Sequence, residues 1–498
     1  MWNKARNSLA RAPTHFTVTG NGVSGLSKRL STLPLSELTA VTSVDGRYGR
    51  HSKELRNVFS EYALIRNRVI VEAEWLKQLA KATELPEVST MSAEAEHFLD
   101  DIVSNFSVED AGRVKEIERT TNHDIKAVEY FLKEKISLHK ELSQSAEFVH
   151  FACTSEDINN LAYALMLKDA RTEIMLPSMD KVISEVSDLA EKLSTTPMLA
   201  RTHGQPATPT TVGKELANFA YRMGRQRKQY EQCEILGKMN GAVGNYAAHQ
   251  ITVRELDWPG MTKKFIENGL GGIKWNPYTT QIEPHDFVAE TCDVVCRFNN
   301  VLLDMDRDMW SYISLGYFKQ KVIEGEIGSS TMPHKVNPID FENSEGNIGL
   351  ANSTLSHLAM KLPISRFQRD LSDSTVMRTL GTGFAYSKIA HNASIRGLSR
   401  IDSNEERLLE DLDKNWEVLA EPVQTVMRRY GKEAPYEALK ELTRGKKVDG
   451  VAMREYISSL DLPQEDKNIL LELEPKTYIG NSAEMAKKEV IQKWLKID

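Results

Sequence analysis

Residues 325–338 read GEIGSSTMPHKVNP, a run of glycines, hydroxyls and one lysine that does not suit regular secondary structure. Gly325 and Gly328 permit backbone angles that other residues resist, and the two prolines discourage a helix on either side. We expect a mobile catalytic loop that holds two serines near Lys335, whose charge favours an alkoxide. An ordinary surface loop has a similar composition, so composition alone does not establish catalysis.

Most of the chain beyond Leu35 carries apolar residues at helical spacing. Five of them between positions 210 and 237 form one stripe, at intervals of four, three, four and seven: Val212, Leu216, Phe219, Met223 and Tyr230. A second stripe occupies residues 182–193, and residues 287–315 contain few helix breakers. Long amphipathic helices bury such stripes in a core or a subunit interface, so the pattern predicts an all-α fold around a long-helix bundle.

Changes in composition divide the chain into four segments. We predict a flexible extension at residues 1–34, an N-terminal helical domain at 35–145, a central long-helix bundle with the loop 325–338 at 146–396, and a C-terminal helical domain at 397–498. Five lysines and arginines and no acid precede Glu37, which is typical of a transit peptide. We therefore expect the cytoplasm, or a mitochondrion or plastid if the extension is a targeting signal.

The overall composition limits the class of protein. The chain has 498 residues, 41% of them hydrophobic and 27% charged, with a net charge of −7, which indicates a soluble globular protein of more than one domain. The mild acidity argues against general nucleic-acid binding, and no apolar run approaches the roughly 18 residues that cross a membrane. Of the four cysteines only Cys292 and Cys296 are close in sequence, so neither a metal site nor a disulfide framework is expected.

Five polar motifs interrupt the helical background. They are DGRY at 45–48, ERTTNHD at 118–124, FACTSED at 151–157, RTHGQPATP at 201–209 and QRDLSDS at 368–374. Arg47 beside Tyr48 suits a phosphate or a carboxylate, and Arg369, Ser374 and Arg378 lie in an arginine-rich cluster of the kind that recognises phosphate. A solvated helix face carries similar charges, so each of these signals is weak by itself.

Three of the motifs also suit acid–base chemistry or anion binding. His203 is the best candidate for a general acid, because an imidazole titrates near neutrality and can protonate a leaving nitrogen. Thr154 or Ser155 is expected to cap a helix whose start binds a carboxylate. His123 beside Asp124 fits a surface cap as well as a site, and a core or capping role for His203 also stays open.

The loop sequence GSSxMPxKxNP resembles the signature of the fumarase/aspartase superfamily, whose members eliminate fumarate or close analogues. The order and spacing of the five motifs resemble its bacterial-type branch that cleaves adenylosuccinate, from about Leu35 to the C-terminus. This resemblance implies a three-domain fold whose long helices form the core of a homotetramer, with each site built from three chains. It also implies elimination of fumarate from adenylosuccinate, giving AMP, and from succinyl-aminoimidazole carboxamide ribotide, giving AICAR, without a cofactor.

The resemblance further implies roles for residues of this sequence. Ser329 would remove the proton from the succinyl Cβ, His203 would protonate the leaving nitrogen, and Glu342 would pair with that histidine. Lys335 and Asn337 would stabilise the negative charge of the intermediate. Other residues would hold the phosphate, the ribose or the succinyl carboxylates: Arg47, Tyr48, Asn122, His123, Asp124, Thr154, Ser155, Thr202, Gln281, Arg369, Ser374 and Arg378.

Two alternative functions stay open. A sister lyase or a cycloisomerase would use the same loop, but a small dicarboxylic acid supplies no phosphate for the arginine cluster around Arg369. A non-catalytic helical scaffold would keep the fold without the chemistry, and the joint presence of Ser329, His203 and Lys335 argues against it.

Replacing Ser329 by alanine is expected to lower fumarate release from adenylosuccinate at least about a hundredfold, because a general base contributes that much or more. Ser330→Ala is the matched control and is expected to keep most of the activity, since the resemblance assigns the proton transfer to the first serine of the pair. The loss of succinyl-adenine absorbance in the ultraviolet measures the rate. Equal losses in both variants would contradict the assignment of the base.

Overall fold

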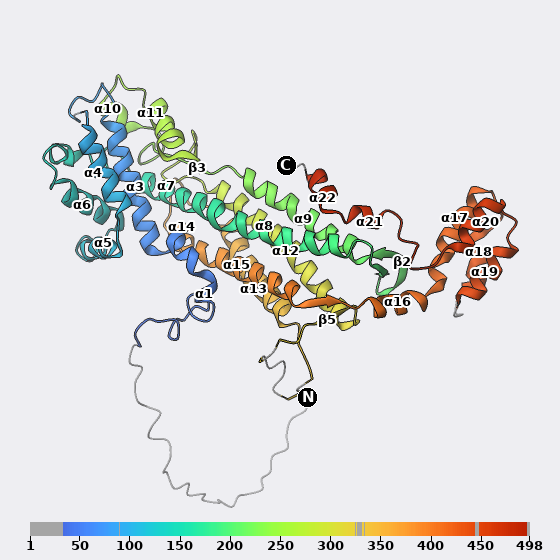
Figure 1. Cartoon of the computed structure of the whole chain (residues 1–498). Helices are drawn as coiled ribbons and strands as arrows, with labels where there is room; N and C mark the ends of the chain where they lie inside the picture. Colours follow the sequence, from blue (N-terminus) through green and yellow to red (C-terminus); the bar gives the residue numbers. More distant parts are fainter. Residues whose placement is uncertain are drawn as a thin grey trace, which may run out of the picture.

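The computed structural model describes residues 33–88, 90–323, 325, 331–332, 334–443 and 448–495. Helices make up most of this part of the chain, and its six strands form three separate two-stranded sheets (Figure 1). The predicted all-α class is therefore confirmed. The predicted flexible extension lies outside the described residues up to residue 32. Residues 326–330 of the predicted catalytic loop, Ser329 among them, also lie outside the described residues.

The first helices of the chain pack around α3, which covers Glu61–Leu79. This helix begins after Ser60, whose side chain accepts a hydrogen bond from the Ala63 amide. Apolar side chains of α5 and α6 pack on its buried face, with Phe131 beside Ile65 in the same cluster. The shorter elements of this region are α1 (Gly49–Ser52), η1 (Lys53–Leu55), α2 (Arg56–Phe59), α4 (Ala93–Ser104), α5 (Val108–Thr121), α6 (Asp124–Ile136) and η2 (Leu142–Phe148).

Long helices form the centre of the molecule, and Figure 1 shows them lying side by side. They are α7 (Ser155–Asp169), the π-helical turn η3 (Ala170–Met175), α8 (Leu176–Lys192), α9 (Val212–Gln232), α12 (Asp286–Ser314), α13 (Ile339–Lys361) and α15 (Leu380–Ser399). The first three follow one another directly, so the chain runs as one helix from Ser155 to Lys192. At 1.5 Å per residue this helix extends over roughly 55 Å.

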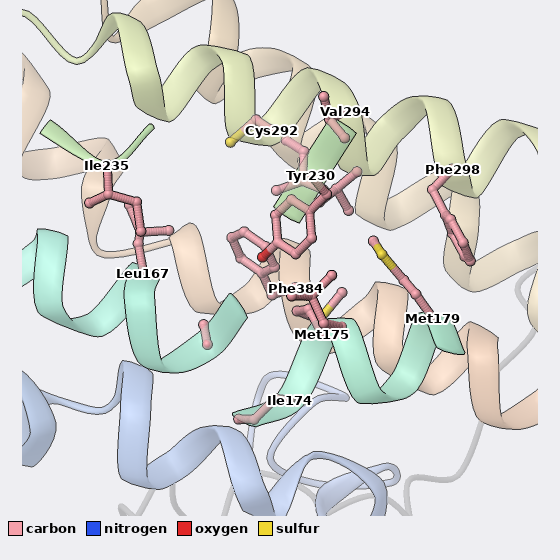
Figure 2. Packing of buried hydrophobic residues seen from close by; sticks show 14 of the residues in the cluster. Leu167, Ile174, Met175, Met179, Tyr230, Ile235, Cys292, Val294, Phe298 and Phe384 are labelled. Atoms are coloured by element: carbon pink, nitrogen blue, oxygen red, sulfur yellow. The ribbon is translucent and has the colours of Figure 1, made fainter. Parts of the chain in front are cut away.

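The core of the bundle is made of apolar side chains from several of these helices. Figure 2 shows Tyr230 of α9 close to Met175 of η3, with Phe298 of α12 and Phe384 of α15 in the same cluster. All four side chains are fully buried. The apolar stripe that the sequence predicts at 212–230 therefore faces the core, because each of its members is buried: Val212, Leu216, Phe219, Met223 and Tyr230.

An antiparallel hairpin follows the end of α8 at the far end of the bundle from α3 (Figure 1). It consists of β1 (Pro197–Thr202) and β2 (Gln205–Thr211), and its tip is His203 and Gly204. Both tip residues have left-handed backbone angles, with φ of 54° and 74°. The other connecting elements are β3 (Leu236–Gly237), α10 (Ala247–Thr252), α11 (Trp258–Lys264), η4 (Phe265–Gly271), β4 (Lys274–Trp275), β5 (Phe318–Gln320), α14 (Ser372–Met377) and β6 (Ile401–Ser403).

The C-terminal helices form a buried cluster of their own and then return to the bundle. Trp416, Met427 and Met453 belong to this separate cluster, whereas Ile491 and Leu495 belong to the core of the bundle. The helices are α16 (Glu405–Asp413), η5 (Trp416–Leu419), α17 (Ala420–Arg429), α18 (Pro435–Thr443), α19 (Gly450–Ser459), α20 (Gln464–Glu472), α21 (Ser482–Met485) and α22 (Lys488–Leu495). The separate cluster involves buried residues between Trp416 and Leu470, and the predicted division into domains stays a proposal.

Within the part of the chain that the structure describes, no helix is both long and apolar enough to span a membrane.

A buried carboxyl group lies between three helices of the bundle. Asp306 of α12 is 1% exposed, and Ser394 of α15 donates a hydrogen bond of 2.8 Å to it. The Ser394 hydroxyl also lies 2.7 Å from the Ser344 hydroxyl of α13. Burial raises the pKa of Asp306 from 3.8 to about 8, against the opposing effect of the two hydroxyls. The folded protein therefore holds this proton at a pH where the unfolded chain has lost it.

Asp306→Asn is expected to become more stable relative to the parent protein as the pH rises from 5 to 8. The parent's stabilisation from the bound proton is fully present below the unfolded pKa and decreases by up to about 1.4 kcal/mol per pH unit until the folded pKa is passed. Asparagine has no proton to lose, so its variant lacks this decrease. Denaturant unfolding at each pH measures the difference, and Asp293→Asn, an exposed site on α12, is the control. A difference independent of pH would contradict the buried titration.

Candidate active site

A pocket of about 560 Å³ lies at the start of α7, where several polar motifs meet; we call it the α7 pocket. Seven of the predicted substrate-binding residues line it: Asn122, His123, Asp124, Ser155, Arg369, Ser374 and Arg378. The other lining residues are Arg68, Glu118, Glu156, Asn159, Tyr163, Leu371 and Thr375. The structure thus brings together three motifs that are separated by up to 250 residues in the sequence.

Helix ends place the polar groups on one side of this pocket. His123 caps α6, and its Nδ1 accepts a hydrogen bond of 3.2 Å from the Lys126 amide. Its Nε2 lies 3.5 Å from the Ser155 hydroxyl at the first residue of α7. Thr154 and Asp157 form a capping box at the same helix start, with Asp157 accepting from the Thr154 amide at 2.8 Å. The predicted cap is thus confirmed, and the helix start opens toward the pocket.

Two arginines share the carboxylate of Asp124. Arg68 Nη2 lies 2.7 Å from Asp124 Oδ2, and Arg378 Nη2 lies 3.6 Å from the same oxygen. Burial raises the pKa of Asp124, but the charge of Arg68 and the Ile125 amide outweigh it and hold the pKa below its usual range. The acid is therefore ionised at neutral pH, where it keeps both guanidinium groups in place.

Arg369 occupies the opposite wall and has three described partners. Its Nη2 lies 2.8 Å from Glu156 Oε1 and 3.4 Å from the Ser374 hydroxyl, and its Nη1 donates to Gln281 at 3.2 Å. Gln281 thus reaches the site through Arg369, although it does not line the pocket. The predicted grouping of Gln281, Arg369 and Ser374 is therefore present within one chain.

Arg47 and Tyr48 lie in a different pocket, of about 470 Å³, between α1 and the helices α13 and α15. The Tyr48 hydroxyl accepts a hydrogen bond of 3.0 Å from Asn343, which the sequence analysis did not single out. Predicted Glu342 is the neighbour of Asn343 on α13 and accepts from the Trp310 indole at 3.1 Å. Lys335 and Asn337 lie shortly before α13, so the second half of the predicted catalytic loop leads to this helix start.

Thr202 and His203 are not brought to either pocket within one chain. They lie exposed at the tip of the β1–β2 hairpin, which begins after α8. Ser155 lies at the other end of the continuous helix that α7, η3 and α8 form, roughly 55 Å away along its axis. A rigid helix of this length keeps the predicted acid and the α7 pocket of one chain apart.

Several residues of the site escaped the sequence analysis. Glu156 lies inside a motif that was noted, but an acid in the first turn of a helix has an obvious capping role. Arg68 lies on α3 between Ile65 and Val69, and a charged residue on an otherwise apolar helix face was the available signal. Asn159 follows Glu156 by three residues on α7 and gave no signal of its own.

The described residues contain no group of three or more His, Cys, Asp or Glu side chains that could hold a metal ion. The expectation that no metal or cofactor takes part stays a prediction.

Comparison with family models supports a lyase. A lyase family model matches residues 46–351, and the model of the adenylosuccinate lyase C-terminal region matches residues 365–479. Two solved structures share the fold with a TM-score of 0.69. One is a 3-carboxy-cis,cis-muconate lactonizing enzyme from Pseudomonas putida, 20% identical, which covers 89% of this chain and 98% of its own. The other is a fumarate lyase from Mesorhizobium sp. BNC1, 18% identical, which covers 88% of this chain and 97% of its own.

Whole-chain relatives are much more similar in sequence. The adenylosuccinate lyase of Vibrio cholerae is 59% identical over 92% of this chain and 100% of its own length. That of Escherichia coli K12 is 59% identical over 91% of this chain and 99% of its own. Fold and sequence together define an enzyme, a lyase of the fumarase/aspartase superfamily. Within that class, the chain belongs to the adenylosuccinate lyase family, and the predicted resemblance is confirmed.

Asp124→Asn is expected to lower the free energy of unfolding by about 2–3 kcal/mol, because it leaves the guanidinium of Arg68 buried without its charged partner. The Arg68 side chain is 2% exposed and that of Asp124 is 29% exposed, so the cost is smaller than for a fully buried pair. Denaturant unfolding measures it.

The control for this prediction is Glu134→Gln, which breaks the exposed pair with Arg113 and is expected to leave the stability nearly unchanged. A combined Arg68→Met and Asp124→Asn variant is expected to recover part of the loss, because no buried charge then remains unpaired. An Asp124→Asn cost no larger than that of the control would show that Arg68 does not depend on this carboxylate.

Proposed function

We propose that the protein eliminates fumarate from adenylosuccinate, giving AMP, and from succinyl-aminoimidazole carboxamide ribotide, giving AICAR. The observation that carries this proposal is the gathering of Arg369, Ser374 and Arg378 with the start of α7 in one pocket. Guanidinium groups and helix starts both bind anions, and these substrates carry a phosphate and two carboxylates. The name of the 59% identical relatives supports the same substrate.

The proposed reaction is a β-elimination by general base and general acid. Ser329 takes the proton from the succinyl Cβ, and the charge spreads into the neighbouring carboxylate as an aci-carboxylate. Lys335 and Asn337 stabilise this charge. The C–N bond then breaks, its electron pair stays on nitrogen, and His203 protonates that nitrogen while Glu342 keeps the imidazole oriented and charged. The proposed reaction therefore consumes no water and requires no redox group.

Substrate binding in the proposal uses residues of the two pockets and of the β1–β2 hairpin described above. Arg369, Ser374 and Arg378, with Arg47 and Tyr48, hold the phosphate and the ribose, and Asn122, His123, Asp124 and Gln281 lie nearby. Thr154, Ser155 and Thr202 hold the succinyl carboxylates. A nucleotide phosphate distinguishes this substrate class from the small dicarboxylic acids of sister lyases, because such acids give the arginine cluster nothing to bind.

Sites shared between subunits of a homotetramer are part of the proposal. The hairpin with Thr202 and His203 and the α7 pocket lie at opposite ends of one long helix. A second chain, packed antiparallel along the bundle, would carry its own hairpin to the α7 pocket of the first. The separation supports a shared site, since one substrate must contact both the proposed acid and the residues of the α7 pocket.

The predicted compartment, cytoplasm or organelle, rests on residues 1–34 and is kept as a prediction. Nucleic acid and membrane are not among the proposed partners.

Mixed oligomers test the shared site. Ser329→Ala and His203→Ala are each expected to be inactive and to keep the native oligomer. When the two are co-expressed, about a quarter of the shared sites combine an intact serine with an intact histidine, so about a quarter of the wild-type fumarate release should return. Each variant expressed and purified alone gives the baseline.

The outcomes separate the two parts of the proposal. Absence of rescue while both variants co-purify in one oligomer would contradict the shared site and leave the reaction standing. Absence of fumarate from adenylosuccinate with the intact wild-type oligomer would contradict the proposed reaction itself.

A further inference from the structure

A chain of hydrogen bonds runs beneath the α7 pocket from one wall to the other. Glu156 Oε1 lies 2.8 Å from Arg369 Nη2 and accepts a second bond, of 2.8 Å, from Asn159 Nδ2. Asn159 Oδ1 in turn accepts from Arg68 Nε at 2.8 Å, and Arg68 donates to Asp124 at 2.7 Å. The elements α3, α6 and α7 are thereby connected with the loop that carries Arg369.

Burial distinguishes Glu156 from Glu61, another acid that pairs with a pocket arginine. The Glu156 side chain is 5% exposed, whereas that of Glu61, which lies 2.5 Å from Arg378, is 40% exposed. An exposed carboxylate can exchange its partner for water when an anionic ligand arrives. A buried carboxylate has no such replacement, because loss of its partner would leave an unpaired charge. We therefore expect Glu156 to stay paired with Arg369 when an anionic ligand binds.

The ion pair with Glu156 also constrains the orientation of the Arg369 guanidinium. A guanidinium group is planar and rigid, so a fixed bond at one nitrogen also fixes the direction of the others. Nη2 is held by Glu156, and Nη1 contacts Gln281. The buried Nε has no hydrogen-bond partner among the described residues. A guanidinium has five N–H donors, and the contacts with Glu156, Gln281 and Ser374 leave capacity for a ligand while Glu156 holds the group in position.

We propose that Glu156 is a positioning residue for nucleotide binding: held by Asn159, it orients the guanidinium of Arg369 toward the phosphorylated half of the substrate. This inference rests on the proposed function for the nature of the ligand. It assigns Glu156 no contact with the reacting atoms, so its influence belongs to binding of the nucleotide and not to the bond-breaking step.

Two substitutions separate position from charge. Glu156→Asp keeps the charge but withdraws the carboxylate by one methylene, and Glu156→Gln keeps the length but removes the charge. Both are expected to raise the Kd for AMP and the KM for adenylosuccinate roughly tenfold, the size of a lost charge-assisted hydrogen bond. The value of kcat is expected to stay within about threefold, and inhibition by fumarate, which has no phosphate, is expected to be unchanged.

The matched control is Glu129, a second buried acid that pairs with lysines on α6 and does not line the pocket. Its side chain is also 5% exposed, so Glu129→Asp and Glu129→Gln impose a similar structural change elsewhere. They are expected to leave AMP binding unchanged. Calorimetric titration of the native oligomer with AMP and with fumarate gives both affinities without requiring turnover.

A further cycle tests whether Glu156 acts through Arg369. In an Arg369→Ala background, Glu156→Asp is expected to have no additional effect on AMP affinity. An undiminished effect in that background would overturn the proposal, as would equal losses for AMP and fumarate. Tighter AMP binding by Glu156→Gln with unchanged binding by Glu156→Asp would show instead that Glu156 competes with phosphate for Arg369. Asn159→Ala, which alters no charge, should show a smaller loss specific to AMP.

Failure of the inference is distinguishable from failure of the proposed function. A wild-type protein that neither binds AMP nor releases fumarate would contradict the function. A wild-type protein that does both, with Glu156 variants indistinguishable from it, would contradict only the role of Glu156.

Discussion

The length of one helix determines how the molecule can build a site. From Ser155 to Lys192 the chain is helical without interruption, and the apolar residues of this helix are buried against α9, α12 and α15. Because a packed helix neither bends nor shortens at low cost, its two ends stay tens of ångströms apart. Everything that the chain places at the start of α7 is therefore separated from the hairpin that follows α8, and one chain alone does not bring all motifs together.

Charge compensation organises the end of the bundle that holds the α7 pocket. The three arginines that line this pocket are each paired with an acid: Arg68 with Asp124, Arg369 with Glu156 and Arg378 with Glu61. The pairs differ in burial, and burial determines which are permanent and which an anionic ligand can displace. The same side chains thus form a rigid frame and an adaptable surface, which is what binding of a phosphorylated substrate requires.

Two titratable groups inside the bundle are held in their neutral forms by burial. Asp306 is surrounded by hydroxyls and has a raised pKa, so it is stable there as a neutral group. His391 of α15 is likewise fully buried, and burial lowers its pKa to about 3, while its Nδ1 lies 2.9 Å from the Ser178 hydroxyl. At these two positions a neutral side chain with a hydrogen bond is buried at little cost, whereas partners and solvent stabilise the charged groups of the pocket.

The sequence predicted the features of this structure that depend on the local spacing of residues. Apolar periodicity predicted the helices and the buried stripe of α9, helix-capping chemistry predicted the start at Ser155, and the short motifs indicated the family. Tertiary structure alone decided which motifs share a pocket and which do not. The pairing of Arg68 with Asp124 and of Glu156 with Arg369 joins residues 56 and 213 positions apart. Such contacts depend on how helices pack, and no local pattern in the sequence encodes that geometry.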